Sequence, residues 1–408
     1  MPIRIVRTAI LAGLMGPIIA SAQTCGNTTL SCLIPTALHT SGPTFNFLNQ
    51  AFGEQIGEVP LATPASGFIY SFDKSLGIPV LSQESFGPLL AERAETIGRH
   101  KGYLAFTYQR YSFTIIDGNG LKNLPILFSF PSAQQPQVVT STQNRIDASL
   151  NQYAVYGTFG ITDRIEVSFA VPLGRVALGV SSTGTEYSTT TSASTSFTEY
   201  LAGTASGIGD VILAGKATVL ERENFALAAG LELRFPSGDA RNFLGSGAYG
   251  VKPYFVWSHR ARSSPKLDWG RIASHLNLAY QWNGTSVLAA TGPNLVEDNL
   301  PSYFGYAAGA EVAFSKRVTG VLDFVGREYF GAAQVSTPQN ITAPVNNTPT
   351  VFSSIVQVNG SYNVNNLGLG FKVNPWNRVL VMANVTFRLN RGGLRATAIP
   401  FVGASYTF

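Results

Sequence analysis

Charged residues on the polar side of alternating segments are the side chains of this sequence most able to act on a solute. Rings of such charges inside a pore select ions and polar solutes. The predicted lumen-facing set is Arg110, Glu166, Lys216, Glu232, Arg234, Lys252, Glu311, Asp323, Arg327, Lys372 and Arg388. Seven of these eleven are basic, which favours a weak preference for anions. The same residues equally suit salt bridges that fill a narrow lumen, so both interpretations stay open.

Enzymatic chemistry has little support in the sequence. Of the four histidines, only His275 lies beside plausible partners, Ser274 and Asn277. Ser274 and His275 are adjacent on a predicted strand and face opposite sides, which prevents the hydrogen bond between a nucleophile and its base. Metal-ligand clusters, phosphate-binding glycine loops and paired carboxylates do not stand out. We therefore expect no enzyme, no metal site and no cofactor.

The composition separates the chain from ordinary soluble enzymes. Only 12% of the 408 residues are charged, against roughly 25% in soluble domains, while 45% are hydrophobic. The apolar runs are all shorter than the roughly 18 residues typical of a membrane helix. A net charge of +5 is too small to indicate a nucleic-acid partner.

Alternation of apolar and polar residues predicts the elements that position the charges. Between 225 and 235, every odd residue is apolar, whereas Glu232 and Arg234 share the other face. Twelve segments of this kind are predicted as strands: 103–114, 145–158, 164–178, 207–219, 224–235, 248–258, 270–282, 302–314, 318–329, 361–373, 378–389 and 396–408.

The links between these strands alternate in length. Those after the second, fourth, eighth and tenth strands are short, and those after the first, third, seventh and ninth are long. The long link after the third strand is a Ser/Thr tract, 181–206, while the links 259–269 and 390–395 fit the rule less well. An even number of strands with short turns at one end indicates an all-β transmembrane antiparallel barrel, with periplasmic turns and long extracellular loops.

A soluble β-sandwich also alternates, but strand length favours the membrane barrel. Sandwich strands cluster near about five or six residues, whereas a tilted membrane strand needs roughly 9 to 11. Trp257, Trp269, Trp282 and Trp376 fall at or near predicted strand ends, where an interfacial aromatic girdle would place them. The outward row of the last strand ends in Tyr406 and Phe408, which resembles the C-terminal signal that the assembly machinery of outer-membrane barrels recognises.

The N-terminus has the features of an export signal. Arg4 and Arg7 precede an apolar stretch, and Ala20-Ser21-Ala22 is a small-residue cleavage site, so residues 1–22 are predicted to be a signal peptide. Cys25 and Cys32 are the only cysteines of this exported chain, which makes a local disulfide the natural expectation.

Residues 23–100 lie outside the predicted barrel, 101–408. They carry several prolines and a charged patch at 92–101. Three interpretations stay open: a periplasmic extension, a plug inside the lumen, or extra strands. A hairpin within 67–80 would raise the barrel to fourteen strands.

Four short motifs carry a resemblance to a known family. They are YGTFGITDRIEVSFAVP at 156–172, GIGDVILAGKATV at 207–219, RFPSGD at 234–239 and GVKPY at 250–254. Their order and spacing resemble the outer-membrane transporter family named after the meta-cleavage pathway of phenol degradation, over residues 145–408. The resemblance implies a Gram-negative outer-membrane transporter of porin-like architecture, and leaves residues 23–100 unexplained.

The expected function is a passive outer-membrane channel for small solutes, with aromatic or weakly polar compounds as the class that the resemblance implies. The expected partners are outer-membrane lipid, the barrel assembly machinery and a small-molecule solute. Trimer and monomer are both consistent with the strand pattern. The main alternative is a closed barrel with a structural or surface-binding role through the loops 181–206 and 331–360. An outer-membrane hydrolase and a soluble secreted β-protein complete the alternatives.

Overall fold

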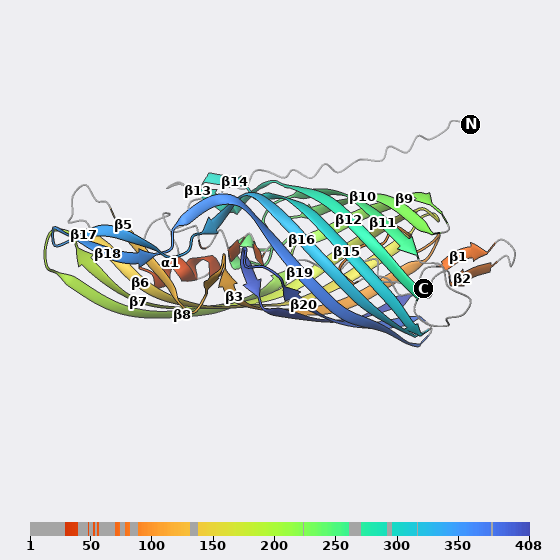
Figure 1. The fold of residues 1–408 in the computed structure, drawn as a ribbon, viewed down its shortest axis with the longest axis horizontal. Helices are drawn as coiled ribbons and strands as arrows, with labels where there is room; N and C mark the ends of the chain where they lie inside the picture. Colours follow the sequence, from red (N-terminus) through yellow and green to blue (C-terminus); the bar gives the residue numbers. More distant parts are fainter. Residues whose placement is uncertain are drawn as a thin grey trace, which may run out of the picture.

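Twelve alternating segments pair into one closed antiparallel barrel (Figure 1). The computed structural model describes residues 29–39, 48, 52–53, 55–56, 70–73, 78–81, 89–130, 138–222, 224–260, 271–291, 296–315, 317–376 and 378–408. The barrel strands are β3 (Gly102–Ile116), β6 (Val138–Gly160), β7 (Ile165–Ser188), β9 (Val211–Glu221), β10 (Phe225–Phe235), β11 (Gly250–Arg260), β12 (Arg271–Asn283), β15 (Ser302–Ser315), β16 (Val318–Val335), β19 (Gln357–Trp376), β20 (Val379–Arg388) and β22 (Ala398–Thr407). The ring closes because β3 pairs with both β6 and β22.

Each of the twelve predicted segments is confirmed as a barrel strand. The alternative of fourteen barrel strands is wrong, because the predicted hairpin pairs only with itself. Its strands, β1 (Tyr70–Asp73) and β2 (Ile78–Leu81), form a separate two-stranded sheet. In Figure 1 this hairpin lies beyond the same end of the barrel as the C-terminus.

The described parts of the long links form hairpins and short strands. The Ser/Thr tract comprises the end of β7, a tight turn and most of β8 (Ser194–Ile208), because alternating Thr and small residues suit an extended strand. The other additions are β4 (Asn119–Gly120), β5 (Leu124–Phe130), η3 (Ala240–Asn242), β13 (Thr285–Thr291), β14 (Val296–Asn299), β17 (Gln339–Val345), β18 (Thr348–Ser354) and β21 (Leu394–Ala396).

We call one part of the molecule the extension: residues 138–150 of β6 and 176–188 of β7, with β5, β8, β17 and β18. It continues the barrel wall at the end opposite to the C-terminus (Figure 1). The β17–β18 hairpin lies beside β5, where the Leu127 amide donates to Ser354 Oγ at 2.8 Å. The short turns, such as residues 161–164 between β6 and β7, lie at the other end.

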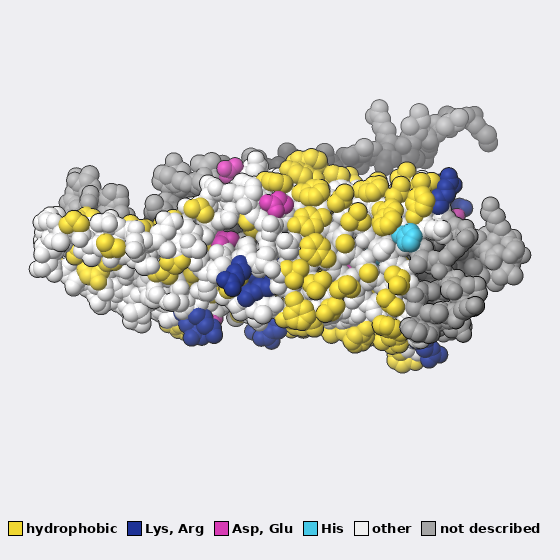
Figure 2. Space-filling view, in the orientation of Figure 1, with side chains coloured by type: hydrophobic (Ala, Val, Ile, Leu, Met, Phe, Trp, Pro, Cys, Tyr) yellow, Lys and Arg dark blue, Asp and Glu magenta, His cyan; other side chains and the backbone are white. Residues whose placement is uncertain are grey.

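The polarity of the two faces of the wall inverts between the barrel and the extension. Near the short-turn end of β7, Val167 and Phe169 are exposed on the outer face, while Glu166 is buried inside. Farther along the same strand, Leu178 and Val180 are the buried inner residues. Figure 2 shows the outcome: a hydrophobic belt covers the barrel, and the extension is mostly polar.

Aromatic side chains lie at the level where the outer face changes from apolar, over the barrel, to polar, over the extension. On the outer face, Tyr108 of β3 and Tyr153 of β6 have ring centroids 5.0 Å apart, and Tyr280 and Trp282 of β12 are 4.9 Å apart. A strand the length of β10, tilted by roughly 45°, spans about 25 Å, which matches the apolar band of a membrane barrel. Trp257 and Trp376 lie toward the short-turn end of their strands, and Trp269 lies outside the described residues.

The core of the extension includes the beginning of the described chain. We call residues 29–39, 48, 52–53 and 55–56 the N-terminal cluster; it contains η1 (Leu30–Cys32) and α1 (Leu33–Ala37). Ile34, Leu38 and Phe52 are fully buried against wall residues such as Ile146 and Leu178. Cys32 is disulfide-bonded, and Cys25 lies outside the described residues. Within the described chain, helices are too short or too polar to cross a membrane.

The C-terminal strand completes the ring. Phe408 and Gly102 exchange two backbone hydrogen bonds, at 2.8 and 2.9 Å. The side chains of Tyr406 and Phe408 both point outward, with ring centroids 6.4 Å apart. Their role as an assembly signal stays a prediction.

Candidate functional site

The structure places ten of the eleven predicted charged residues on the inner face of the wall; the exception is Arg110. Arg110 lies on the exposed outer face of β3, in line with Leu104 and Phe106. Its position follows from the inversion of the two faces. Arg110 is two residues beyond Tyr108, where the outer face has left the apolar belt and is polar.

A stretch of the N-terminal region lies across the lumen. We call residues 89–98 the inner segment. Its backbone amides donate to side chains of the wall: those of Leu89 and Leu90 to Asp323 Oδ2 at 3.0 and 2.8 Å. Farther along, the Ile97 amide donates to Glu166 Oε2 at 2.7 Å. The wall therefore recognises the backbone of this segment.

The wall also donates to the carbonyl oxygens of the inner segment. Lys216 Nζ donates to Arg93 O at 2.8 Å, and Thr218 Oγ1 to Ala94 O at 2.7 Å. The Lys216 ammonium also lies 2.9 Å from carboxylate oxygens of both Glu92 and Glu166. With 2% of its side chain exposed, Lys216 is a buried cation between two carboxylates.

A buried row of polar residues lies under the same segment. Ser258 Oγ is 2.8 Å from His275 Nδ1, and His275 Nε2 is 2.6 Å from Glu311 Oε1. The residue types are those of a hydrolytic triad, but Ser258 Oγ accepts the Ala94 amide at 2.8 Å and is fully buried beneath it. The row thus fixes the inner segment. As expected from the alternation, Ser274 is absent from it.

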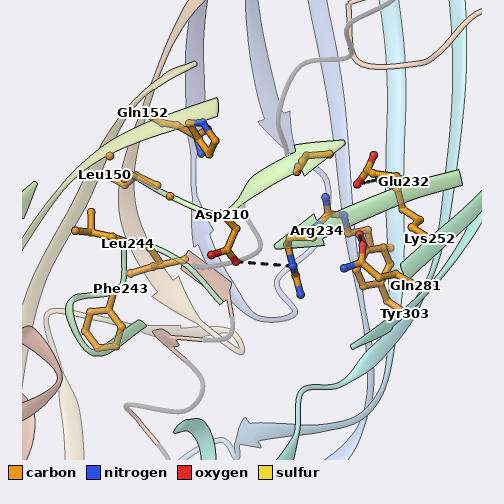
Figure 3. Close-up of a pocket in the computed structure, with 16 residues that line it drawn as sticks. Leu150, Gln152, Asp210, Glu232, Arg234, Phe243, Leu244, Lys252, Gln281 and Tyr303 are labelled. Atoms are coloured by element: carbon orange, nitrogen blue, oxygen red, sulfur yellow. Dashed lines mark hydrogen bonds and ion pairs between the residues drawn. The ribbon is translucent and has the colours of Figure 1, made fainter. Parts of the chain in front are cut away.

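Two cavities lie between the inner segment and the N-terminal cluster. The larger, about 170 Å³, borders Leu90 and Glu92 of the inner segment. The other, about 110 Å³, reaches Ile56 of the N-terminal cluster and is drawn in Figure 3. The ion pair of Glu232 and Lys252, 2.7 Å long, lines both. The described residues therefore place the inner segment beside one cavity and the N-terminal cluster beside the other.

Small side chains on the inner wall create the larger cavity. They are Ser168, Ala170, Ala214, Ala279, Gly305 and Ala307. In the second cavity, Asp210 and Arg234 point toward each other, with Oδ2 and Nε 3.8 Å apart (Figure 3). Arg234 Nη2 also donates to Asn283 Oδ1 at 2.8 Å. Because opposite charges are paired across this space, it suits a weakly polar solute better than a free ion.

A row of tyrosines lines the wall beside these cavities. Tyr303, Tyr329 and Tyr362 are direct neighbours across β15, β16 and β19, with ring centroids 5.2 and 5.1 Å apart. The guanidinium of Arg327 lies 4.8 Å from the Tyr303 ring centroid, and its Nη1 donates to the Tyr329 hydroxyl at 3.2 Å. Tyr303 in turn donates to Gln281 Oε1 at 2.6 Å. The row offers aromatic faces and fixed hydroxyls to a solute.

The remaining predicted charges lie at the two ends of this space. Lys372 is fully buried on the inner wall, and Arg388 donates to Thr114 Oγ1 at 3.3 Å near the extension. Asp117 accepts the Val335 and Gly393 amides there at 2.9 and 2.7 Å, and burial raises the pKa of its carboxyl group. The described residues contain no group of three or more metal-ligating side chains.

Sequence reasoning missed most of the contacts within the site. The pairs Glu166–Lys216 and Glu232–Lys252 are direct cross-strand neighbours, so a predicted register would have joined them. Ser258 and His275 are also direct neighbours, on β11 and β12. Nothing in the sequence pattern places the inner segment against them, because its recognition is by backbone atoms.

Solved structures of similar architecture include the following three. An outer membrane channel from Pseudomonas putida F1 aligns with TM-score 0.45 and 13% identity, over 77% of this chain and 98% of that one. The translocator domain of the autotransporter NalP from Neisseria meningitidis aligns with TM-score 0.32 and 11% identity, over 76% and 89%. The Ralstonia pickettii toluene transporter TbuX aligns with TM-score 0.31 and 9% identity, over 76% and 89%. A search of curated proteins found no match to the sequence.

The family comparison confirms the resemblance seen in the turn motifs. A family model matches residues 129–375, which is more than half of the chain. The match includes strands from both sides of the central cavities and all four motifs. The chain belongs to the family described as "Putative MetA-pathway of phenol degradation".

Proposed function

We propose that the protein is a bacterial outer-membrane channel for small, weakly polar solutes, small aromatic compounds among them. The observation that carries this proposal is a cavity of about 170 Å³ inside a closed barrel with an apolar outer belt. For comparison, an apolar protein cavity of about 150 Å³ holds a benzene molecule. The tyrosine row and the family description, which refers to phenol, support an aromatic solute.

The orientation we propose follows from the two ends of the barrel. The short turns and the C-terminus face the periplasm, and the polar extension faces the outside of the cell. Residues 1–22, which lie outside the described residues, serve as a cleaved signal peptide. Phe408 and Tyr406 present the outward aromatic pair to the assembly machinery.

Residues 23–100 act in this proposal as the plug of the channel. Two of its described parts, the inner segment and the N-terminal cluster, bound the central cavities on either side. The inner segment is held by hydrogen bonds between wall side chains and backbone, each worth about 0.5 to 1.5 kcal/mol net, or about 1.5 to 3 kcal/mol where the side chain is charged. Such contacts break singly at modest cost, so this segment is the part we expect to shift when a solute passes.

A closed barrel with a structural or surface-binding role is the second candidate. The observation that favours it is that both ends of the central space are occupied by the same N-terminal region. In this alternative the cavities are internal voids, and the extension provides a surface for contacts outside the cell.

Solute uptake by cells distinguishes the two candidates. We expect cells with an intact lipopolysaccharide layer to take up radiolabelled phenol faster when they carry the protein. Ala279→Phe fills the larger cavity and should abolish the gain, whereas Ala383→Phe, on the outer face, is the matched control. Equal uptake with and without the folded protein would support the closed barrel instead.

A further inference from the structure

A third cavity adjoins the inner face of β16 on the side of β19, whereas the larger central cavity extends from β16 toward β15. The third cavity measures about 60 Å³, and Val325 and Arg327 line both spaces. Its other sides come from β3, β19, β21 and the N-terminal cluster. None of the described residues that line it carries a carboxylate, in contrast to the paired charges of the central cavities. We call this space the arginine cavity.

Arg395 of β21 is a buried cation on the arginine cavity with unused hydrogen-bonding capacity. Only 4% of the residue is exposed. Its Nη2 donates to Asn365 O and Asn366 Oδ1, both at 2.7 Å. Its Nη1 has no hydrogen-bond partner among the described residues. A buried guanidinium nitrogen without an acceptor is unfavourable, so a bound acceptor at this position is stabilising.

Gln55 of the N-terminal cluster adds a second unused donor. Its Oε1 accepts the Leu394 amide, while Nε2 is buried and has no partner among the described residues. Gln55 and Arg395 both line the arginine cavity. Two donors without acceptors on one small space match the two oxygens of a carboxylate.

Positive charge accumulates around the cavity. Arg327 lines it as well, and the charge of Arg388 acts on Arg395. An anion bound among these cations is attracted by all of them and reduces their mutual repulsion. The charge therefore selects an anionic ligand rather than a neutral one.

The walls of the cavity are aromatic on the side of β3 and β16. Tyr111 and Phe113 lie with ring centroids 6.0 Å apart, and Tyr329 faces the same space. The arginine cavity alone is smaller than a benzene ring requires, so an aromatic ligand bound here extends past Arg327, which lines both this cavity and the larger one. The ligand that fits this lining carries a carboxylate on a flat apolar body.

We propose that the arginine cavity is a binding subsite for a small aromatic acid in its carboxylate form. The carboxylate accepts hydrogen bonds from Arg395 Nη1 and Gln55 Nε2, and the ring packs beside Tyr329. The inference rests on the proposed channel function and deepens it, because it makes aromatic anions a substrate class of the same lumen.

Calorimetric titration of the full mature chain in detergent tests the subsite with benzoate as the probe. Arg395→Gln should weaken benzoate binding by about tenfold or more, because the charge-assisted hydrogen bond from Arg395 Nη1 and the positive charge are both lost. Arg395→Lys keeps the charge without the planar fork and should weaken it less. Arg145→Gln, on the exposed face of β6, is the matched control and should leave binding unchanged.

Two results would overturn the subsite: no benzoate binding by the folded protein, or equal affinity in the wild type and Arg395→Gln. Benzamide has the shape of benzoate without the charge, and equal binding of the two would also contradict the assignment. Phenol uptake by cells separates this result from the channel itself. Phenol uptake without benzoate binding refutes only the subsite, and benzoate binding without phenol uptake refutes only the channel.

Discussion

The barrel and the extension share strands but show opposite faces to their surroundings. In the barrel, Phe169 of β7 is exposed outside and Glu166 is buried inside, whereas in the extension Leu178 of the same strand is buried inside. The alternation of side chains is unbroken between them. Alternation therefore shows only that successive side chains point to opposite faces of a strand. The surroundings of each face decide which face is apolar.

The barrel and the extension also differ in the kind of contact that holds N-terminal residues inside them. The barrel holds the inner segment by hydrogen bonds and an ion triad around Lys216. The extension holds the N-terminal cluster by apolar packing of residues such as Ile34 and Phe52. The comparison predicts that mutations of polar inner residues weaken the barrel, and that mutations of apolar inner residues weaken the extension.

The largest expected effect is at the polar interior of the barrel. Lys216→Met leaves the carboxylates of Glu92 and Glu166 buried without their cation, so the free energy of unfolding should fall by roughly 3 to 5 kcal/mol. Urea titration in lipid vesicles measures it. Lys252→Met is the matched control, since its ion pair is about one-fifth exposed and should cost less. Equal costs for the two variants would contradict the triad.

A comparable loss is expected at the apolar interior of the extension. Leu178→Ala removes a buried side chain that packs with the N-terminal cluster and should cost about 2 to 4 kcal/mol in local stability. Thermolysin digestion should then release the N-terminal cluster sooner. Ala177→Ser, on the outer face of the same strand, should leave digestion unchanged. Unchanged digestion of Leu178→Ala would show that the cluster is not held by this packing.

The outer faces provide the third test. Leu231→Arg puts a charge into the apolar belt and should cost roughly 2 to 4 kcal/mol if the residue lies near the bilayer midplane. Tyr200→Arg, on the exposed outer face of the extension, should change stability by no more than about 0.5 kcal/mol. Similar values for both variants, measured by the same urea titration, would remove the distinction between the two parts.

The smallest expected change in the free energy of unfolding is at the boundary between the barrel and the extension. Arg110→Leu replaces an outer-face charge just beyond Tyr108 and should change the free energy of unfolding by less than about 0.5 kcal/mol. A gain well above this value would place Arg110 inside the apolar belt. Urea titration at matched lipid composition decides between the two positions.

Much of the barrel was predictable because its strands have a strict period of two. All twelve segments, the short turns and ten of the eleven inner charges follow from alternation and link length. Arg110 did not follow, because the polar face changes sides along β3 at a level that only the membrane boundary defines. The hairpin nature of the Ser/Thr tract was also missed, because Ser and Thr suit both loops and solvated strands.

The site was less predictable than the wall. The inner segment is bound through its amides and carbonyl oxygens, and backbone atoms leave no pattern in a sequence. Arg395 lies on the short strand β21, in the link between two predicted strands. The alternation pattern therefore did not assign its side chain to the inner or the outer face. Pairings such as Ser258 with His275 require the register of neighbouring strands, which the turn motifs alone do not set.

We infer that the outer face of β7 changes from lipid to water along the length of the strand. Spin labels at successive outer positions of β7, from Val167 to Thr183, test it through their accessibility to oxygen and to a water-soluble nickel complex in vesicles. We predict oxygen-accessible labels at Val167 and Phe169, and nickel-accessible labels at Ser181 and Thr183. A single uniform environment along β7, either lipid or water, would contradict the account.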